Sequence, residues 1–328
     1  MELAGSTILI TGGTGSFGHR VARFLIDHKP AAIRIYSRDE KKQWDMQKAF
    51  PTLQYMVGDV RDRDRLRDAM EGVDFVFHAA ALKQVPSCEA APGEALKTNT
   101  IGSMNVCEAA TAAGVRTVVA LSTDKAVKPI NAMGMTKALM EKVVSAQNLT
   151  RSTPIFACVR YGNVMGSRGS VIPYFRQLIA KDQPITVTLP EMTRFLLTLD
   201  ESVDLVVRAL TTARGGEIFV RKAPACTVMA LAEAMRRKYS PRGDEHEIKG
   251  VGVRPGEKIH EILVNEYEMQ RSVEEENFFV VHPEYRPTSP PPNRDVGDEY
   301  TSENTNRITD HAEISALLDR IGDTVEYS

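Results

Sequence analysis

A glycine-rich turn near the N-terminus constrains the fold more than any other feature of this sequence. Gly12, Gly15 and Gly18 are spaced as Gly-x-x-Gly-x-x-Gly, after the apolar run Ser6–Thr11 and before the helical pattern Phe17–His28. Glycines at these positions permit a tight turn and a close approach of the backbone to a pyrophosphate, which the helix N-terminus meets with its N–H groups. The motif therefore predicts a dinucleotide-binding βαβ unit.

Apolar, strand-forming segments alternate with helical patterns along the first half of the chain. Such alternation predicts right-handed crossovers between parallel strands, and therefore an α/β fold. We expect a doubly wound parallel Rossmann sheet of six or seven strands. The expected strands are Ser6–Thr11, Ala31–Tyr36, Tyr55–Val57, Phe75–His78, Thr117–Leu121 and Ile155–Arg160. Besides Phe17–His28, the helices expected between these strands are Asp64–Met70, Gly93–Ala113 and Thr136–Asn148.

Beyond Gly162 the alternation loosens, and the pattern predicts a smaller C-terminal substrate-binding lobe. One unit, the helix Glu201–Thr211 with the strand Glu217–Val220, is expected to return to the main sheet. We therefore assign residues 1–165 and about 196–222 to a cofactor-binding Rossmann domain, and about 166–195 and 223–328 to the lobe. The other expected elements are the helices Ile172–Ala180, Val228–Tyr239 and about His311–Leu318, and a Pro-rich surface strap at His282–Asn293.

The end of the second expected strand bears on the choice of cofactor. Ser37 and Arg38 stand where the adenosine ribose of a dinucleotide lies, about 20 residues past the glycine turn. A hydroxyl and a guanidinium suit a 2′-phosphate, and Lys41 is placed to assist, so the sequence favours NADP. Asp39 keeps NAD open as the alternative, because an acidic residue binds the two ribose hydroxyls.

Further cofactor contacts are expected after the next two strands. Asp59 is placed to accept a hydrogen bond from the adenine amino group, or else to cap a helix. Asn99 is expected to brace the active-site strand beside the cofactor. The remaining residues expected at the cofactor are Gly12, Thr14, Gly15, Ser16, Phe17, Gly18, Val60, Ala79, Ala80 and Ala81.

A segment in the middle of the chain has the layout of a short-chain dehydrogenase/reductase active site. Such sites carry a Tyr-x-x-x-Lys pair preceded by Ser-Thr, and here Lys137 is kept while Met133 stands at the tyrosine position. A thioether cannot take up a proton. The ionisable neighbours Asp124 and Lys125 survive beside it, and adjacent charges can shift each other's pKa towards the working range. We therefore expect the acid–base chemistry to have moved to other side chains.

Several longer motifs together are specific enough to indicate a family. They are Thr11–Gly18, Tyr36–Lys42, Gly58–Arg61, His78–Glu89, Ser122–Ala126, Pro129–Gly134, Arg160–Pro173, Met192–Phe195 and Arg254–Glu257. Almost from end to end, they resemble the extended short-chain dehydrogenases, and within them the UDP-N-acetylglucosamine 4,6-dehydratases of bacterial surface-glycan pathways. The resemblance is strongest to the inverting capsule-pathway (CapE-like) branch, which also carries Met at the tyrosine position.

The resemblance implies an NADP-dependent lyase that oxidises sugar C4, removes water across C5–C6 and inverts C5. Its product is a UDP-4-keto-6-deoxy-L-arabino-HexNAc for polysaccharides of the L-FucNAc type. It makes Asp124 the acid for the leaving C6 hydroxyl, Lys125 the base at C5 and Thr123 a hydrogen-bond partner of O4. Lys137 would bind the nicotinamide ribose and lower nearby pKa values, and Met133 would form an apolar wall. The group that deprotonates O4 stays open among Lys125, a water and Thr123.

The same resemblance places the nucleotide sugar, UDP-N-acetylglucosamine, against the later half of the chain. Guanidinium forks match phosphate oxygens, so Arg194 and Arg254 are expected at the diphosphate. Glu257 is placed to accept from the uridine ribose. The other residues assigned to the substrate are Lys83, Asn163, Ser170 and Val171, while Tyr161 and Asn163 are also assigned to the cofactor. The resemblance further implies a homo-oligomer, a dimer or a hexamer.

Composition and charge exclude several other classes. The formal net charge is -2 with both signs interspersed, which favours neither nucleic acid nor a membrane surface as a partner. No signal peptide or membrane-spanning run is seen, so we expect a cytoplasmic protein with reduced, mostly buried cysteines and no metal site. The alternatives are a retaining 4,6-dehydratase, a nucleotide-sugar epimerase, or an NADP-binding regulatory protein without catalysis. Asp124 and Lys125 argue against the epimerase, which needs no elimination across C5–C6.

Overall fold

The alternating first half of the chain forms the parallel sheet that its pattern predicts. The computed structural model describes residues 3–285 and 298–321. Its main sheet has nine strands in the order β14-β15-β10-β6-β5-β4-β1-β2-β3, parallel from β10 to β3, which contains the Rossmann order and confirms the α/β class. The strands are β1 (Thr7–Thr11), β2 (Ala32–Ser37), β3 (Gln54–Val57), β4 (Phe75–His78), β5 (Thr117–Leu121), β6 (Ile155–Arg160), β10 (Ile218–Arg221), β14 (Ser272–Glu274) and β15 (Phe278–Val281).

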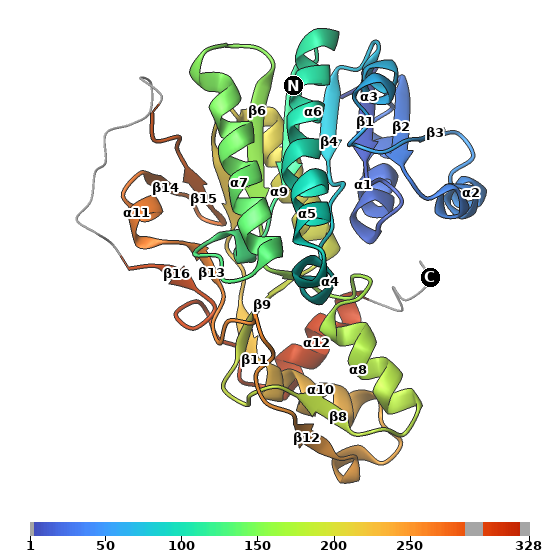
Figure 1. Ribbon diagram of the computed structural model, residues 1–328. Coiled ribbons are helices and arrows are strands. Elements are labelled where there is room, and N and C mark those ends of the chain that lie inside the picture. The colour runs from blue at the N-terminus through green and yellow to red at the C-terminus, as the bar shows by residue number, and fades with distance from the viewer. Residues whose placement is uncertain (1–2, 286–297, 322–328) are drawn as a thin grey trace.

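Helices cover both faces of this sheet (Figure 1). One face packs its apolar side chains against α3, α6 and α7, and the other against α1 and α9, giving two buried cores. Buried parallel strands are apolar on both faces for this reason. The helices of this part are α1 (Ser16–Asp27), α2 (Glu40–Ala49), α3 (Arg63–Met70), α4 (Val85–Ala90), α5 (Pro92–Ala95), the π-helical η1 (Leu96–Ile101), α6 (Gly102–Ala113), η2 (Asp124–Ala126), α7 (Ala132–Ala146), η3 (Gln147–Leu149), α9 (Leu199–Thr212) and α11 (Glu266–Met269).

The sheet is wider than the expected six or seven strands, because β15 and β14 extend it beyond β10. Both pair antiparallel, β15 with β10 and β14 with β15. We had assigned these residues to the second lobe, and that placement is wrong. They form a short hairpin that follows no crossover helix, so the βαβ pattern gave no signal for it. Its main-chain groups satisfy an edge of β10 that would otherwise stay unpaired.

The second lobe lies beyond the carboxyl ends of the parallel strands and has a core of its own (Figure 1). Its amphipathic helices pack around Phe175, Leu231 and Leu318. The remaining elements are β7 (Asn163–Val164), α8 (Val171–Ala180), β8 (Ile185–Val187), β9 (Thr193–Leu197), β11 (Ala225–Thr227), α10 (Val228–Tyr239), η4 (Gly243–Glu245), β12 (Ile248–Gly250), β13 (Ile262–Val264), β16 (Tyr300–Thr301) and α12 (His311–Ile321). Most of the expected Pro-rich strap, from residue 286 onward, lies outside the described residues.

Two further observations concern the whole described chain. Across residues 3–285 and 298–321, no helix combines the length and the apolar character needed to cross a membrane. The four cysteines, Cys88, Cys107, Cys158 and Cys226, are free thiols and all are buried, as expected.

Candidate active site

The glycine turn between β1 and α1 has the shape that a dinucleotide pyrophosphate requires. Gly12 has a φ of +67°, and a Cβ there would lie 2.7 Å from the backbone nitrogen of Ala80. Helix α1 follows Gly15, and among the described residues no side chain caps this helix. Its N–H groups and positive dipole end therefore remain available to an anion. Thr14 lies in the same turn, Ala79 and Ala81 lie in the loop after β4, and the first turn of α1 contains Ser16, Phe17 and Gly18.

At the adenosine end of this site, Arg38 follows β2 and lies beside Asp59. Their closest side-chain atoms, Nη1 and Oδ2, are 3.5 Å apart, and about half of the Arg38 side chain is exposed. The Asp59 carboxylate also accepts from Arg61, at 2.7 Å from Nη2. Asp62, rather than Asp59, caps α3 by accepting from a backbone N–H. The helix-cap alternative for Asp59 is thus wrong, while Val60 beside it is buried.

Two other residues expected near the ribose have different partners. Lys41 forms an ion pair with Asp45 one helical turn further along α2, so its expected assistance to Arg38 is not seen. Asp39 caps the same helix by accepting a backbone hydrogen bond from Lys42 at 3.0 Å. The buried Ser37 hydroxyl accepts from a glutamine side chain of α2. Arg38 differs from Lys41 in that its carboxylate neighbour, Asp59, is itself a residue assigned to the cofactor.

A buried polar chain supports the loop that follows β4. His78 lies between the hydroxyls of Thr11, at 2.7 Å, and Ser103, at 2.8 Å, and burial lowers its pKa to about 3. Asn99, in the π-helical turn, is fully buried and uses its amide to donate to and accept from the backbone of Leu82. Its expected place at the cofactor is therefore corrected: Asn99 holds the loop that lies against the cofactor site.

The candidate catalytic side chains follow the carboxyl end of β5. The Thr123 hydroxyl donates to Oδ1 of Asp124 at 2.8 Å, and the amine of Lys125 donates to the same oxygen at 3.0 Å. Asp124 is almost fully buried, and its other oxygen has no hydrogen-bond partner among the described residues. The expected acid–base pair is thus in direct contact.

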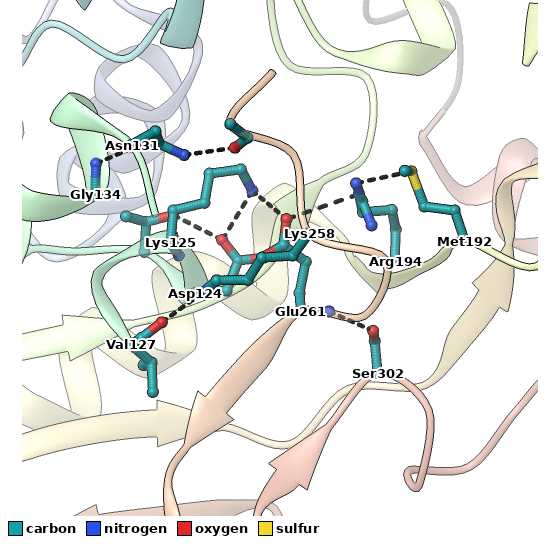
Figure 2. A network of polar contacts seen from close by, with 12 residues as sticks. Asp124, Lys125, Val127, Asn131, Gly134, Met192, Arg194, Lys258, Glu261 and Ser302 are labelled. Atoms are coloured by element: carbon teal, nitrogen blue, oxygen red, sulfur yellow. Dashed lines mark hydrogen bonds and ion pairs between the residues drawn. The ribbon is translucent and has the colours of Figure 1, made fainter. Parts of the chain in front are cut away.

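Glu261 also reaches this pair, and the sequence analysis missed it. Its carboxylate lies 3.1 Å from the Lys125 amine and 3.8 Å from Nε of Arg194 (Figure 2). Burial alone would lower the pKa of Lys125, but the carboxylates of Asp124 and Glu261 outweigh this effect and raise it. We expected the pKa of this amine to shift towards neutrality, but its surroundings shift it the opposite way.

Helix α7 presents Met133 and Lys137 from successive turns. Met133 is buried in an apolar cluster with Cys88 and Ala95, which leaves it as a packing residue. Lys137 is also buried, and burial lowers its pKa to about 8. The helix places an apolar group where the superfamily has an acid–base group, and a cation one turn later.

Residues assigned to the substrate carry buried oxygens that lack a partner. Within the described residues this holds for Oδ1 of Asn163, Oγ of Ser170 and Oε2 of Glu257. Buried polar atoms are normally satisfied, so each of these three oxygens is a candidate ligand contact. Ser170 precedes Val171 at the start of α8, Tyr161 is partly buried after β6, and Arg254 is exposed.

Two loops are fastened beside these oxygens. The amide of Asn131 donates to the carbonyl of Gly256 at 2.8 Å, and the Lys258 amine donates to the carbonyl of Val127, which holds the loop of Arg254 and Glu257 against the start of α7. The loop before α8 is held on the cofactor side. There Lys83 donates to the carbonyl of Arg168 at 2.8 Å, and the N–H of Arg168 donates to Ser16 at 3.2 Å.

Comparison with known proteins identifies the family. The model of the polysaccharide biosynthesis protein family matches residues 8–283. The chain belongs to this family. A family relative from Rickettsia bellii (strain RML369-C), named UDP-glucose 4-epimerase, is 47% identical over 325 residues, covering 92% of each chain. A protein of the same name from Rickettsia felis is 52% identical over 274 residues, covering 81% of this chain and 80% of that one.

Solved structures agree with the fold of this polysaccharide biosynthesis protein. The X-ray structure of Pen from Bacillus thuringiensis superposes with a TM-score of 0.90 at 36% identity, covering 98% of this chain and 99% of that chain. DesIV, a dTDP-glucose 4,6-dehydratase from Streptomyces venezuelae solved with NAD bound, gives a TM-score of 0.70 at 22% identity, covering 77% and 86%. At that identity the likeness to DesIV shows the Rossmann-type fold alone.

Proposed function

We propose that this polysaccharide biosynthesis protein is an NADP-dependent UDP-N-acetylglucosamine 4,6-dehydratase that inverts C5. The observation that supports this proposal most is the buried contact between Asp124 and Lys125 beside the end of β5. Elimination of water needs one group that removes the C5 proton and one that protonates the leaving C6 hydroxyl. The two side chains meet that requirement.

NADP fits the residues around the glycine turn. The N-terminus of α1 and the close approach of Gly12 to Ala80 suit a pyrophosphate, and Arg38 suits a 2′-phosphate. Bound there, the nicotinamide supplies reversible hydride transfer, which oxidises the sugar at C4 and later reduces it at C6. Lys137, one turn past Met133, is the cation that would hold the nicotinamide ribose.

Asp124 and Lys125 divide the proton transfers between them. Asp124 accepts from both Thr123 and Lys125, and the proposed sequence starts with the proton on Lys125. Transfer of that proton along the 3.0 Å contact gives an amine and a carboxylic acid. The amine of Lys125 then removes the C5 proton, and Asp124 protonates the leaving hydroxyl. Thr123, whose hydroxyl contacts the Asp124 carboxylate, would hold O4.

The nucleotide would occupy the region of unpartnered oxygens. Asn163, Ser170 and Glu257 offer acceptors, and Arg254 offers a guanidinium on a loop fixed beside them. Arg194 would contribute less directly, because its guanidinium already donates to the carbonyl of Thr193 at 2.7 Å. Lys83 and Val171 flank the same region.

A second copy of the chain would complete the assembly. Neighbouring helical segments η1, α6 and α7 expose Leu96, Ile101, Met104, Met135 and Leu139. Apolar side chains gathered on one face favour contact with another protein surface. They support a homo-oligomer in which α6 and α7 form the contact.

UDP-glucose 4-epimerase is the second candidate, favoured by the names of relatives that are about half identical to this chain. Its chemistry ends with oxidation and reduction at C4. The buried pair Asp124–Lys125 has no task in that reaction, which involves no elimination across C5–C6. These residues favour the dehydratase.

Product analysis separates the candidates. The protein is incubated with NADP and either UDP-N-acetylglucosamine or UDP-glucose in deuterated water, and the products are examined by mass spectrometry and NMR. We expect loss of water from the first substrate, one deuteron at C5, the L-arabino configuration and no accumulation of reduced cofactor. A 4-epimer formed without loss of water would establish the epimerase, and a D-xylo ketone would establish the retaining dehydratase. Absence of turnover with either substrate would favour a regulatory protein.

A further inference from the structure

The acid–base pair has a third member on a different part of the chain. Oε1 of Glu261 lies 3.1 Å from the Lys125 amine, and Oδ1 of Asp124 lies 3.0 Å from the same nitrogen (Figure 2). Both carboxylates are 1% exposed. The amine is thus clamped between two buried carboxylates, one adjacent in sequence and one that precedes β13.

The position of Glu261 is fixed by its own backbone. Its N–H donates to the hydroxyl of Ser302 at 2.9 Å, and the N–H of Ser302 donates to the carbonyl of Glu261 at 2.8 Å. The same hydroxyl lies 2.7 Å from that of Thr193, which precedes Arg194 on β9. Segments from β9, β13 and β16 therefore converge to hold this carboxylate beside Lys125.

Other charges face Lys125 from neighbouring elements. Arg194 comes from β9, and its Nε lies 3.8 Å from Glu261. Lys258 lies close enough for electrostatic interaction with Asp124, Lys125 and Glu261, and its amine is fixed on the carbonyl of Val127. Asp124 and Glu261 each keep one buried oxygen without a hydrogen-bond partner among the described residues. Each carboxylate therefore uses one oxygen to contact Lys125 and keeps the other without a partner in the described residues.

We propose that Glu261 is a positioning residue, which with Asp124 clamps the Lys125 amine and links it to Arg194. This inference rests on the proposed function, because that function makes Lys125 the base at C5. The contacts of Glu261 with Lys125 and Arg194 do not depend on it. The clamp fixes the direction of the amine, so that proton exchange occurs with Asp124 along a defined contact. The raised pKa of Lys125, to which both carboxylates contribute against the effect of burial, agrees with this role.

The first test measures the protonation of Lys125 directly. Trace acetylation of lysine amines over a range of pH, read by peptide mass spectrometry, gives an apparent pKa for each amine without any need for turnover. In Glu261→Gln, removal of the carboxylate is expected to lower the value for Lys125 by about one pH unit or more. An unchanged profile for Lys125 in a folded variant would overturn the proposal.

The chain offers a matched control. Lys128 is paired on the surface with Glu266 at 2.8 Å and also with Glu299, and both carboxylates raise its pKa. Glu266→Gln is expected to lower the apparent pKa of Lys128 and leave that of Lys125 unchanged, whereas Glu261→Gln does the reverse. Should Glu261→Gln unfold, Glu261→Asp takes its place, with a smaller shift of Lys125 in the same direction. If the apparent pKa of Lys125 fell in both Glu→Gln variants, any nearby carboxylate would have the same effect, and this result would count against the clamp.

Kinetics then separate this proposal from the proposed function. If the dehydratase activity is present, Glu261→Gln should lower kcat tenfold or more, displace the pH profile of kcat to lower pH and leave NADP affinity unchanged. If the wild type proves to have another activity, the labelling shift still decides whether Glu261 positions Lys125. A normal kcat with an undisplaced profile in an active enzyme would reject the positioning role.

Discussion

The side-chain amine of Lys137 donates a hydrogen bond of 2.5 Å to the carbonyl oxygen of Leu121, the last residue of β5. The contact joins α7 to the strand end that carries the candidate catalytic residues. It also keeps a lysine in a buried place, where burial lowers its pKa to about 8 from an ordinary value of 10.5. A charge held there costs stability, and that cost depends on pH.

Lys137→Met is expected to stabilise the cofactor-free protein at pH 7 while it reduces activity. Between pH 8 and 10.5 the unfolded chain holds a proton that folded Lys137 has lost, so the stability of the wild type rises through this window. The gain of the variant is expected to be about 3 kcal/mol below pH 8 and to vanish near pH 10.5. Chemical denaturation of both proteins across this range measures it, and a difference independent of pH would contradict the assignment.

Arg38→Ala is expected to weaken NADP binding roughly ten- to hundredfold, the value of a charged hydrogen bond to a phosphate, with little effect on NAD. Lys41→Ala is the matched control, because Lys41 is paired with Asp45 and should not contribute. Titration calorimetry of the wild type and both variants with each cofactor measures the affinities. Equal binding of NADP and NAD by the wild type would refute the preference.

Asp124→Asn is expected to slow turnover roughly 10²- to 10⁴-fold, the usual loss for a general acid. Lys125→Ala should abolish loss of water, because the base at C5 is gone. Neither residue belongs to the glycine turn, so NADP affinity should remain close to that of the wild type. Near-normal turnover in one of the two variants would remove that residue from the mechanism.

Met133→Tyr is expected to leave turnover unchanged or to lower it. Met133 packs against Cys88 and Ala95, and a phenol in this cluster would crowd it at a typical cost of about 1–3 kcal/mol. If Met133 merely replaced a catalytic tyrosine that the enzyme still needs, the new phenol should raise kcat by a large factor. A comparison of kcat decides, and a hundredfold gain would show that the apolar wall is the wrong interpretation.

The sequence predicted those parts of the fold that rest on buried parallel strands. Phe75–His78, Thr117–Leu121 and Ile155–Arg160 begin and end at the predicted residues, because such strands are continuous apolar runs. Helix α2 was missed because it buries only Gln43 and Met46 and has little apolar periodicity. β14 and β15 were missed because they form an antiparallel hairpin at the end of the sheet, which the alternation of parallel strands and crossover helices does not predict.

The site was predictable where its residues are neighbours in sequence. Asp124 and Lys125 are adjacent, so the motif alone places both at the end of the same strand. The pairing of Lys41 with Asp45 had a signal, four residues of separation on a helix, that the sequence analysis did not use. The sequence signal for Glu261 was weak: this residue follows the Arg254–Glu257 motif and precedes an apolar strand. Its contact with Lys125 depends on how two distant segments pack.

The antiparallel hairpin at the edge of the main sheet has a consequence for biosynthesis. β10 is paired with β6 on one side and with β15 on the other. A nascent chain that has left the ribosome as far as Arg221 therefore displays an apolar strand with bare main-chain groups on its outer side. That edge stays open to other polypeptides until Phe278–Val281 have been synthesised. Premature termination between these two strands should yield a polypeptide that aggregates or is captured by chaperones.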